Sequence, residues 1–121
     1  MGGNDRDGPA LLEGLTMAWI FLVGAGLLEI VWAFAMKQSL GFTRLVPTLV
    51  TFVSMAGSFA LLALAMQTLP LGTAYTIWTG IGAMGAFLIG IAVLGEVASP
   101  MRLAAAGLIV SGLLLMKFSS A

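Results

Sequence analysis

The sequence predicts an all-α membrane protein with four transmembrane helices joined by short loops. Of its 121 residues, 60% are hydrophobic and only 8% are charged, and the apolar residues fall in long runs. A helix that spans the hydrocarbon core of a bilayer needs about 20 apolar residues. Four such helices with short connections account for residues 17–121, and they leave no room for a soluble catalytic domain.

Residue types that the chain lacks exclude several classes of function. The chain has no His and no Cys, so it carries no imidazole for acid–base or metal chemistry, no thiol nucleophile and no disulfide framework. Five basic and five acidic residues give a formal net charge of zero, whereas a nucleic-acid-binding protein would show a basic patch. We therefore expect no enzymatic activity, no metal or other cofactor, and no nucleic-acid partner.

Residues 1–16 differ in composition from the rest of the chain. They combine Asp5, Arg6, Asp7 and Glu13 with Gly, Asn and Pro, a mixture with little apolar surface to bury. A secretory signal peptide would place basic residues before its apolar core, but these charges are mostly acidic. The sequence therefore predicts a flexible N-terminal extension followed by a first helix that is retained.

The first two helices have recognisable ends. We expect the first at about 17–36, where Lys37 closes it and Gly41 marks the turn. We expect the second at about 45–66. Pro47 would lie in its first turn, where the missing backbone N–H costs nothing.

The last two helices are separated by a clear break. The third is expected at about 73–94 and is rich in small and aromatic residues. Pro100 breaks the chain before the fourth, which is expected at about 101–118. Arg102 and Lys117 lie near its two ends, where long side chains can reach the lipid headgroups.

The basic residues give the chain little preference for one orientation in the membrane. One face would carry Arg6 and Lys117, and the other would carry Lys37, Arg44 and Arg102. The positive-inside rule draws only a weak orientation from two against three. Four helices also enclose too little interior to surround a hydrated ion. We therefore expect a multi-pass protein of the inner (plasma) membrane that inserts both ways and pairs as an antiparallel homodimer.

Glu29 is the only ionisable residue well inside any of the four expected helices. A charged side chain at the bilayer centre costs about 2 to 4 kcal/mol, so such residues mark functional sites. This acid can hold a proton or, after losing it, a cation. The alternative is a carboxylic acid that only packs against a neighbouring helix, although Ser or Thr would supply such a bond at lower cost.

Helical spacing gathers further candidate side chains around this acid. Gly26 and Trp32 lie three residues to either side of it, on the same face of the first helix. Ser58 on the second helix can point inward, and so can Tyr75 and Trp78, which lie three residues apart on the third. A carboxylate flanked by Trp, Tyr and Ser groups can bind an organic cation. An interfacial aromatic belt is the alternative for the two aromatic residues of the third helix.

Small residues indicate two further features. The Gly80-Ile81-Gly82 step can bend the third helix, although close packing is the commoner use of such residues. On the fourth helix, three small residues at helical spacing suggest pairing with a second copy, and ordinary lipid-facing composition is the alternative. These residues are Gly107, Ser111 and Gly112.

Three segments are specific enough to indicate a family. They are GLLEIVWAFAMK at 26–37, LPLGTAYTIWTGIGAMGA at 69–86 and LGEVASPMRL at 94–103. With these segments, the chain from Met17 onward resembles the small multidrug resistance family of four-helix proton-coupled exporters. Trp32, three residues after the membrane acid, resembles the guanidinium exporter subtype of that family.

The resemblance implies a mechanism and a role for several residues. It implies an antiparallel homodimer that exchanges guanidinium for protons by alternating access, with Glu29 of each subunit at a shared site. It also implies that Trp32, Ser58 and Trp78 frame the acid with hydrogen bonds, and that Tyr75 helps to shape or gate the site.

The same resemblance assigns the remaining features and exposes one departure. The Gly80–Gly82 step would be a kink that changes with access, and the fourth helix would be the dimer contact. Thr76 stands where the family commonly has Ala, so the substrate range stays open. An exporter of bulky quaternary ammonium compounds is the alternative within the family, and a passive channel or a membrane scaffold is the alternative outside it.

The donors and acceptors of a guanidinium site restrict what each side chain can do. Guanidinium carries only N–H donors, and a carboxylate can meet two of them in a bidentate pair. An indole N–H is also only a donor. We therefore expect Trp32 and Trp78 to donate to the carboxylate of Glu29, and not to contact the edge of the guanidinium.

Overall fold

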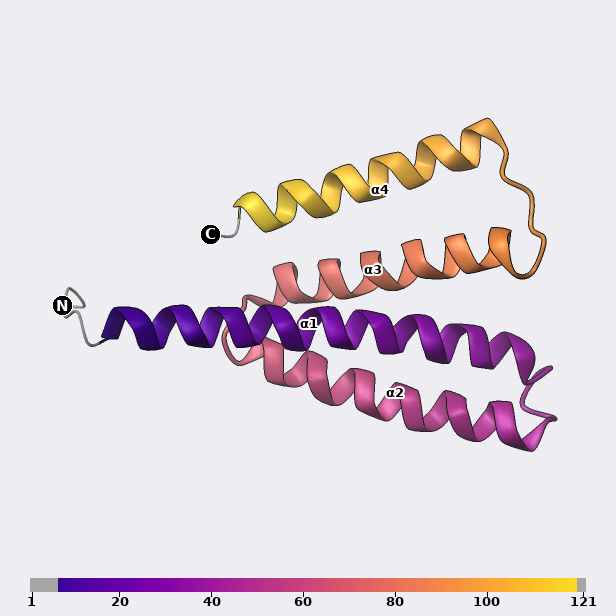
Figure 1. Cartoon of the computed structure of the whole chain (residues 1–121), viewed down its shortest axis with the longest axis horizontal. Helices are drawn as coiled ribbons and strands as arrows, with labels where there is room; N and C mark the ends of the chain where they lie inside the picture. Colours follow the sequence, from indigo (N-terminus) through magenta and orange to yellow (C-terminus); the bar gives the residue numbers. More distant parts are fainter. Residues whose placement is uncertain (1–6, 120–121) are drawn as a thin grey trace.

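The computed structural model describes residues 7–119, and their backbone forms four helices and no strand (Figure 1). The helices are α1 (Asp7–Gln38), α2 (Leu45–Met66), α3 (Leu71–Ala92) and α4 (Pro100–Ser119). Each is long and apolar enough to cross a membrane. The predicted all-α fold with four transmembrane helices and short loops is therefore confirmed.

The predicted N-terminal boundary is wrong. Helix α1 begins at Asp7, so residues 7–16 of the expected flexible extension are helical, and residues 1–6 lie outside the described part of the chain. The segment 10–13 reads Ala-Leu-Leu-Glu, all strong helix formers, and Pro9 is tolerated in a first turn. Adding residues to an existing helix is also far easier than starting one.

The other helix bounds lie close to the expected ones. Helix α2 has the predicted bounds, and α4 extends the prediction slightly at both ends. Helix α3 begins at Leu71, earlier than the predicted 73, because the extended backbone of Pro70 (φ −60°, ψ 150°) lies directly before it as the N-cap. Helix α3 ends at Ala92, slightly before the predicted end at 94, and Val93 is its C-cap.

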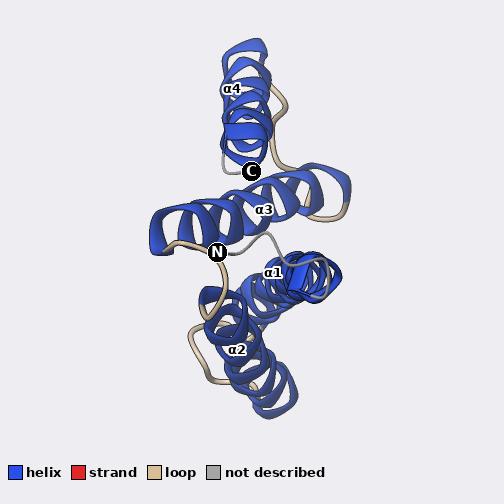
Figure 2. Ribbon diagram, turned by 90° about the vertical axis from the view of Figure 1, so that its left-hand side faces the viewer, coloured by secondary structure: helices blue, strands red, loops and turns tan. Residues whose placement is uncertain are grey.

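Helices α1, α2 and α3 pack into one body, and α4 lies against its edge, where Leu113 and Met116 pack on it. Figure 2 shows α4 beside α3 and away from α1 and α2. The core of the three-helix body is made largely of small and aliphatic residues from all three helices. It comprises Ala18, Leu22, Ala25, Leu62, Ala65, Leu69, Ala74, Ile77 and Trp78. No described residue of α4 is buried, so its surface is left for lipid or for another protein.

Ser39 organises the loop between α1 and α2. Its side chain is fully buried, and its Oγ donates to the carbonyl of Met36 (2.7 Å) and accepts from the N–H of Phe42 (3.0 Å). Three consecutive residues, Leu40, Gly41 and Phe42, have positive φ angles of 51°, 74° and 66°. Two of these are non-glycine residues in a conformation that costs energy, so the bonds to Ser39 hold a strained turn.

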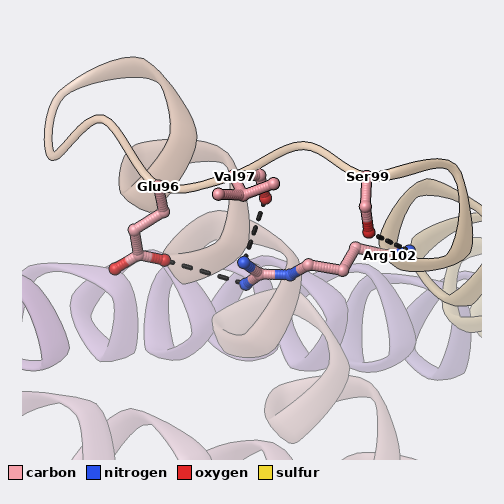
Figure 3. A network of polar contacts seen from close by, with 4 residues as sticks. All are labelled: Glu96, Val97, Ser99 and Arg102. Carbon is pink, nitrogen blue, oxygen red and sulfur yellow. Dashed lines mark hydrogen bonds and ion pairs between the residues drawn. The ribbon is translucent and has the colours of Figure 1, made fainter.

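Arg102 organises the loop between α3 and α4 (Figure 3). Its guanidinium donates to the carbonyl of Val97 (3.0 Å) and lies 3.8 Å from Oε1 of Glu96. Its backbone N–H donates to Oγ of Ser99 (3.2 Å), which caps the start of α4. Gly95, with φ of 71°, supplies the left-handed turn that ends α3. These contacts fix the loop on which α4 depends for its position.

We predict that Ser39→Ala lowers the free energy of unfolding by about 1–3 kcal/mol, because the N–H of Phe42 and the carbonyl of Met36 both lose their side-chain partner. Reversible denaturation in mixed micelles measures this. Ser119→Ala is the matched control, since the Ser119 hydroxyl also donates to a carbonyl three residues earlier, that of Met116, but in an exposed position, and its loss should cost less than about 0.5 kcal/mol. Equal effects of the two substitutions would contradict the role given to Ser39.

Candidate functional site

Glu29 lies on the face of α1 that packs against α3. A Cβ atom built on Gly82 would overlap the carboxyl Cδ and Oε1 of Glu29. The carboxyl group therefore occupies the space that the missing side chain of Gly82 leaves. Oε1 is buried and has no hydrogen-bond partner among the described residues. The structure thus places one carboxylate between two helices with an oxygen still able to accept.

Ser58 links the three helices of the body at the level of this acid. Its side chain is fully buried, and its Oγ donates to the backbone carbonyl of Ala25 on α1 (2.6 Å). Nε1 of Trp78 on α3 donates to the same Oγ (2.9 Å). In an α-helix the carbonyl of Ala25 also accepts the N–H of Glu29. The chain of bonds from α3 through α2 therefore ends on the turn of α1 that carries the acid.

The expectation that Trp78 donates to Glu29 is wrong in this structure, and the same expectation for Trp32 stays a prediction. The single N–H of Trp78 is already used on Ser58. Nε1 of Trp32 is buried but has no hydrogen-bond partner among the described residues. Ser58 comes from the helix on the other side of α1, and its hydroxyl can both donate and accept, so it takes the bond that sequence reasoning assigned to the carboxylate.

Tyr75 lies at the edge of the site and faces outward more than expected. Its side chain is 53% exposed, and its ring is tilted by 52° against that of Trp78 at a centroid distance of 5.4 Å. It also lines, with Thr76, a largely apolar cavity of about 550 Å³ between α3 and α4. The aromatic pair predicted from spacing is therefore in contact, but only Trp78 is buried in the body.

Sequence reasoning missed two contributors to the site. Phe59 packs edge-on against Trp78 at a centroid distance of 5.6 Å, and its place next to Ser58 is the signal that could have found it. Ala25 contributes only its backbone carbonyl. No side-chain pattern reveals such an acceptor, because every residue of a helix carries one.

Glycines allow α1 and α3 to approach closely around the acid. A Cβ on Gly26 would lie 2.6 Å from Cγ2 of Ile81, which faces it across the interface. A Cβ on Gly85 would overlap the side chain of Ile30. Each glycine thus receives a side chain from the opposite helix, and Gly26 and Ile81 form part of the site's framework as a packed pair.

Gly80 and Gly82 lie within an unbroken helix. Helix α3 continues from Leu71 to Ala92, and the backbone holds no interruption between these two glycines. Gly82 receives Glu29, and Gly80 receives the side chain of Leu113 from α4. In this conformation both glycines serve close packing, and the expected kink at Gly80-Ile81-Gly82 stays a prediction.

The three small residues of α4 lie on an open surface. Nothing lies within 4 Å of a Cβ built on Gly107 or Gly112. Ser111 is exposed, and its Oγ donates to the carbonyl of Gly107 within the same helix (2.8 Å). These residues therefore make no contact inside the chain that would explain their small size.

The arrangement can bind one positive charge at a time. Glu29 is a single carboxylate inside an apolar body, and within residues 12–119 no cluster of acidic, His or Cys side chains of the kind that holds a metal ion was found. A carboxylate of this type takes up either a proton or a cation.

Comparison with known proteins agrees with this geometry. The family model described as Small Multidrug Resistance protein matches residues 17–109. The guanidinium exporter of Citrobacter freundii is 56% identical over 104 residues, which cover 86% of this chain and 99% of the relative. The guanidinium exporters of Escherichia coli strain K12 and Salmonella typhi are each 57% identical with the same coverage.

The match to the family model covers α2 and α3 completely, most of α1 and the first half of α4. With its four membrane-spanning helices, the protein is a multi-pass inner-membrane transporter and not an enzyme. The chain belongs to the small multidrug resistance family.

Proposed function

We propose that this protein exports guanidinium in exchange for protons by alternating access. The observation that carries the proposal is Glu29, a carboxylate with one buried, unpartnered oxygen in a chain closely similar to guanidinium exporters. A planar cation with N–H donors along its edge suits a carboxylate that can accept two of them.

Competition at Glu29 supplies the coupling. A proton that binds the carboxylate removes the charge that holds guanidinium, and guanidinium that binds it excludes the proton. A transporter that opens only one side at a time then releases cargo where protons are abundant and loads it where they are scarce.

The hydrogen bonds around the acid are proposed to position it. The bonds from Trp78 to Ser58 and from Ser58 to Ala25 hold the turn before Glu29. Trp32 retains an unused buried donor, and we assign it to the carboxylate once guanidinium is bound. Tyr75, at the edge of the body, shapes the approach to the site.

An antiparallel homodimer completes the proposal. Gly107, Ser111 and Gly112 lie on the open face of α4 and serve as its contact with the second copy. Two copies in opposite orientations present one Glu29 each to a shared site.

Glu29→Gln is expected to abolish proton-coupled guanidinium transport while the protein stays folded. The amide keeps the volume of the carboxyl group but neither titrates nor carries charge. Guanidinium-driven pH changes in proteoliposomes measure the coupling. The matched control is Glu13→Gln, the same change at an exposed position of the same helix, which should transport at the wild-type rate. Coupled transport by Glu29→Gln would refute the mechanism, and guanidinium flux without proton movement in the wild type would indicate a passive channel.

Gly82→Ala is expected to weaken guanidinium binding by about tenfold or more, because the added methyl group overlaps the carboxyl group of Glu29. Binding to purified protein is measured by calorimetry. Gly72→Ala lies in the first turn of the same helix with nothing within 4 Å of its Cβ, so its affinity should match the wild type. Equal affinities of the two variants would show that the carboxyl group does not depend on this space.

Ser58→Ala is expected to destabilise the protein more than Trp78→Phe. The first substitution leaves the buried indole N–H without an acceptor, whereas the second removes the donor and leaves Ser58 bonded to Ala25. A double-mutant cycle of unfolding free energies should give a coupling of about 1 kcal/mol. A coupling near zero, together with a changed pH midpoint of guanidinium binding in Trp78→Phe, would show that the indole acts on Glu29 instead.

A further inference from the structure

A second cavity lies outside the candidate site, between α1, α3 and the loop that precedes α4. Its volume is about 300 Å³, at the lower end of the range of ligand pockets. Its apolar wall includes Phe34, Phe87 and Leu94. The charged groups on its wall are Lys37, Glu96 and Arg102. The proposed transport mechanism uses none of these residues.

The charges on this wall leave one cation without a partner. Arg102 lies 3.8 Å from Oε1 of Glu96, and its guanidinium also lies over the ring of Phe87 at 5.5 Å (Figure 3 shows the ion pair). These two opposite charges largely cancel. Lys37 forms no ion pair with another residue of the described chain. The cavity therefore keeps a net positive charge, which matches one phosphodiester.

The cavity lies at the depth of the lipid headgroups. Lys37 is in the last turn of α1, and Arg102 is in the first turn of α4, so both lie where membrane-spanning helices leave the hydrocarbon. Basic pockets between transmembrane helices bind anionic headgroups at this level. The rings of Phe34 and Phe87 would contact the glycerol and the first acyl carbons of a lipid. A free phosphate ion has no apolar part that could make these contacts.

We propose that this cavity binds the headgroup of an anionic phospholipid, with the phosphodiester beside Lys37. The site is independent of Glu29 and therefore does not rest on the proposed transport cycle. Lys37 is the residue to test, because Arg102 also holds the loop before α4.

The experiment adds equimolar phosphatidylglycerol and phosphatidylcholine to the purified full-length protein in detergent and counts bound lipids by native mass spectrometry. We expect wild-type protein to retain phosphatidylglycerol preferentially. Lys37→Gln should weaken this retention about fivefold, as the loss of one basic residue at a membrane surface predicts. Lys37→Arg keeps the charge and should retain the lipid, which separates a lost charge from a disturbed fold.

Arg44→Gln is the matched control. Arg44 is an exposed basic residue directly before α2, at the same end of the bundle as Lys37. It does not line the cavity. Its substitution should leave lipid retention unchanged, and millimolar inorganic phosphate should not displace the lipid. Equal retention of the two lipids, an equal loss in Arg44→Gln, or displacement by phosphate would each overturn the proposal. The proposal would also be overturned if no lipid bound because a second copy of the protein covered the cavity.

Discussion

The fold depends on covering one carboxylate inside an apolar helix. In a bilayer the carboxyl group of Glu29 has to be shielded from lipid, so protein has to cover it on the lipid side. Helix α3 does this because Gly82 gives up its side-chain space to the carboxyl group. The same close approach is repeated where Gly26 meets Ile81 and Gly85 meets Ile30. The glycines of the interface thus make room for the carboxyl group of Glu29 as well as for close packing of α1 on α3.

Hydropathy and length were sufficient to predict the architecture. Four apolar runs of bilayer length allow only four spanning helices. The short loops require consecutive helices to run in opposite directions. Glu29 stood out because it is the one ionisable residue deep in a span. The start of α1 at Asp7 was missed because the charged residues, glycines and Pro9 of this segment outweighed the strong helix formers at 10–13, through which an existing helix extends at little cost.

The partners of the site residues were harder to predict than the residues themselves. Sequence spacing grouped Ser58 and Trp78 near the acid, but it could not show that the indole bonds the hydroxyl and that the hydroxyl bonds a backbone carbonyl of α1. Helix rotation decides between such partners, and spacing along one helix says nothing of the rotation of the next. The backbone acceptor on Ala25 has no sequence signature at all.

The position of α4 at the edge of the other helices bears on how the chain is made. Helices α1, α2 and α3 share a core to which α4 contributes no buried residue, and α4 follows them along the chain. The three-helix body can therefore assemble in the membrane during synthesis, before α4 has emerged from the ribosome. Helix α4 then joins the edge of an assembled unit and keeps a largely exposed, apolar surface for contact with another chain.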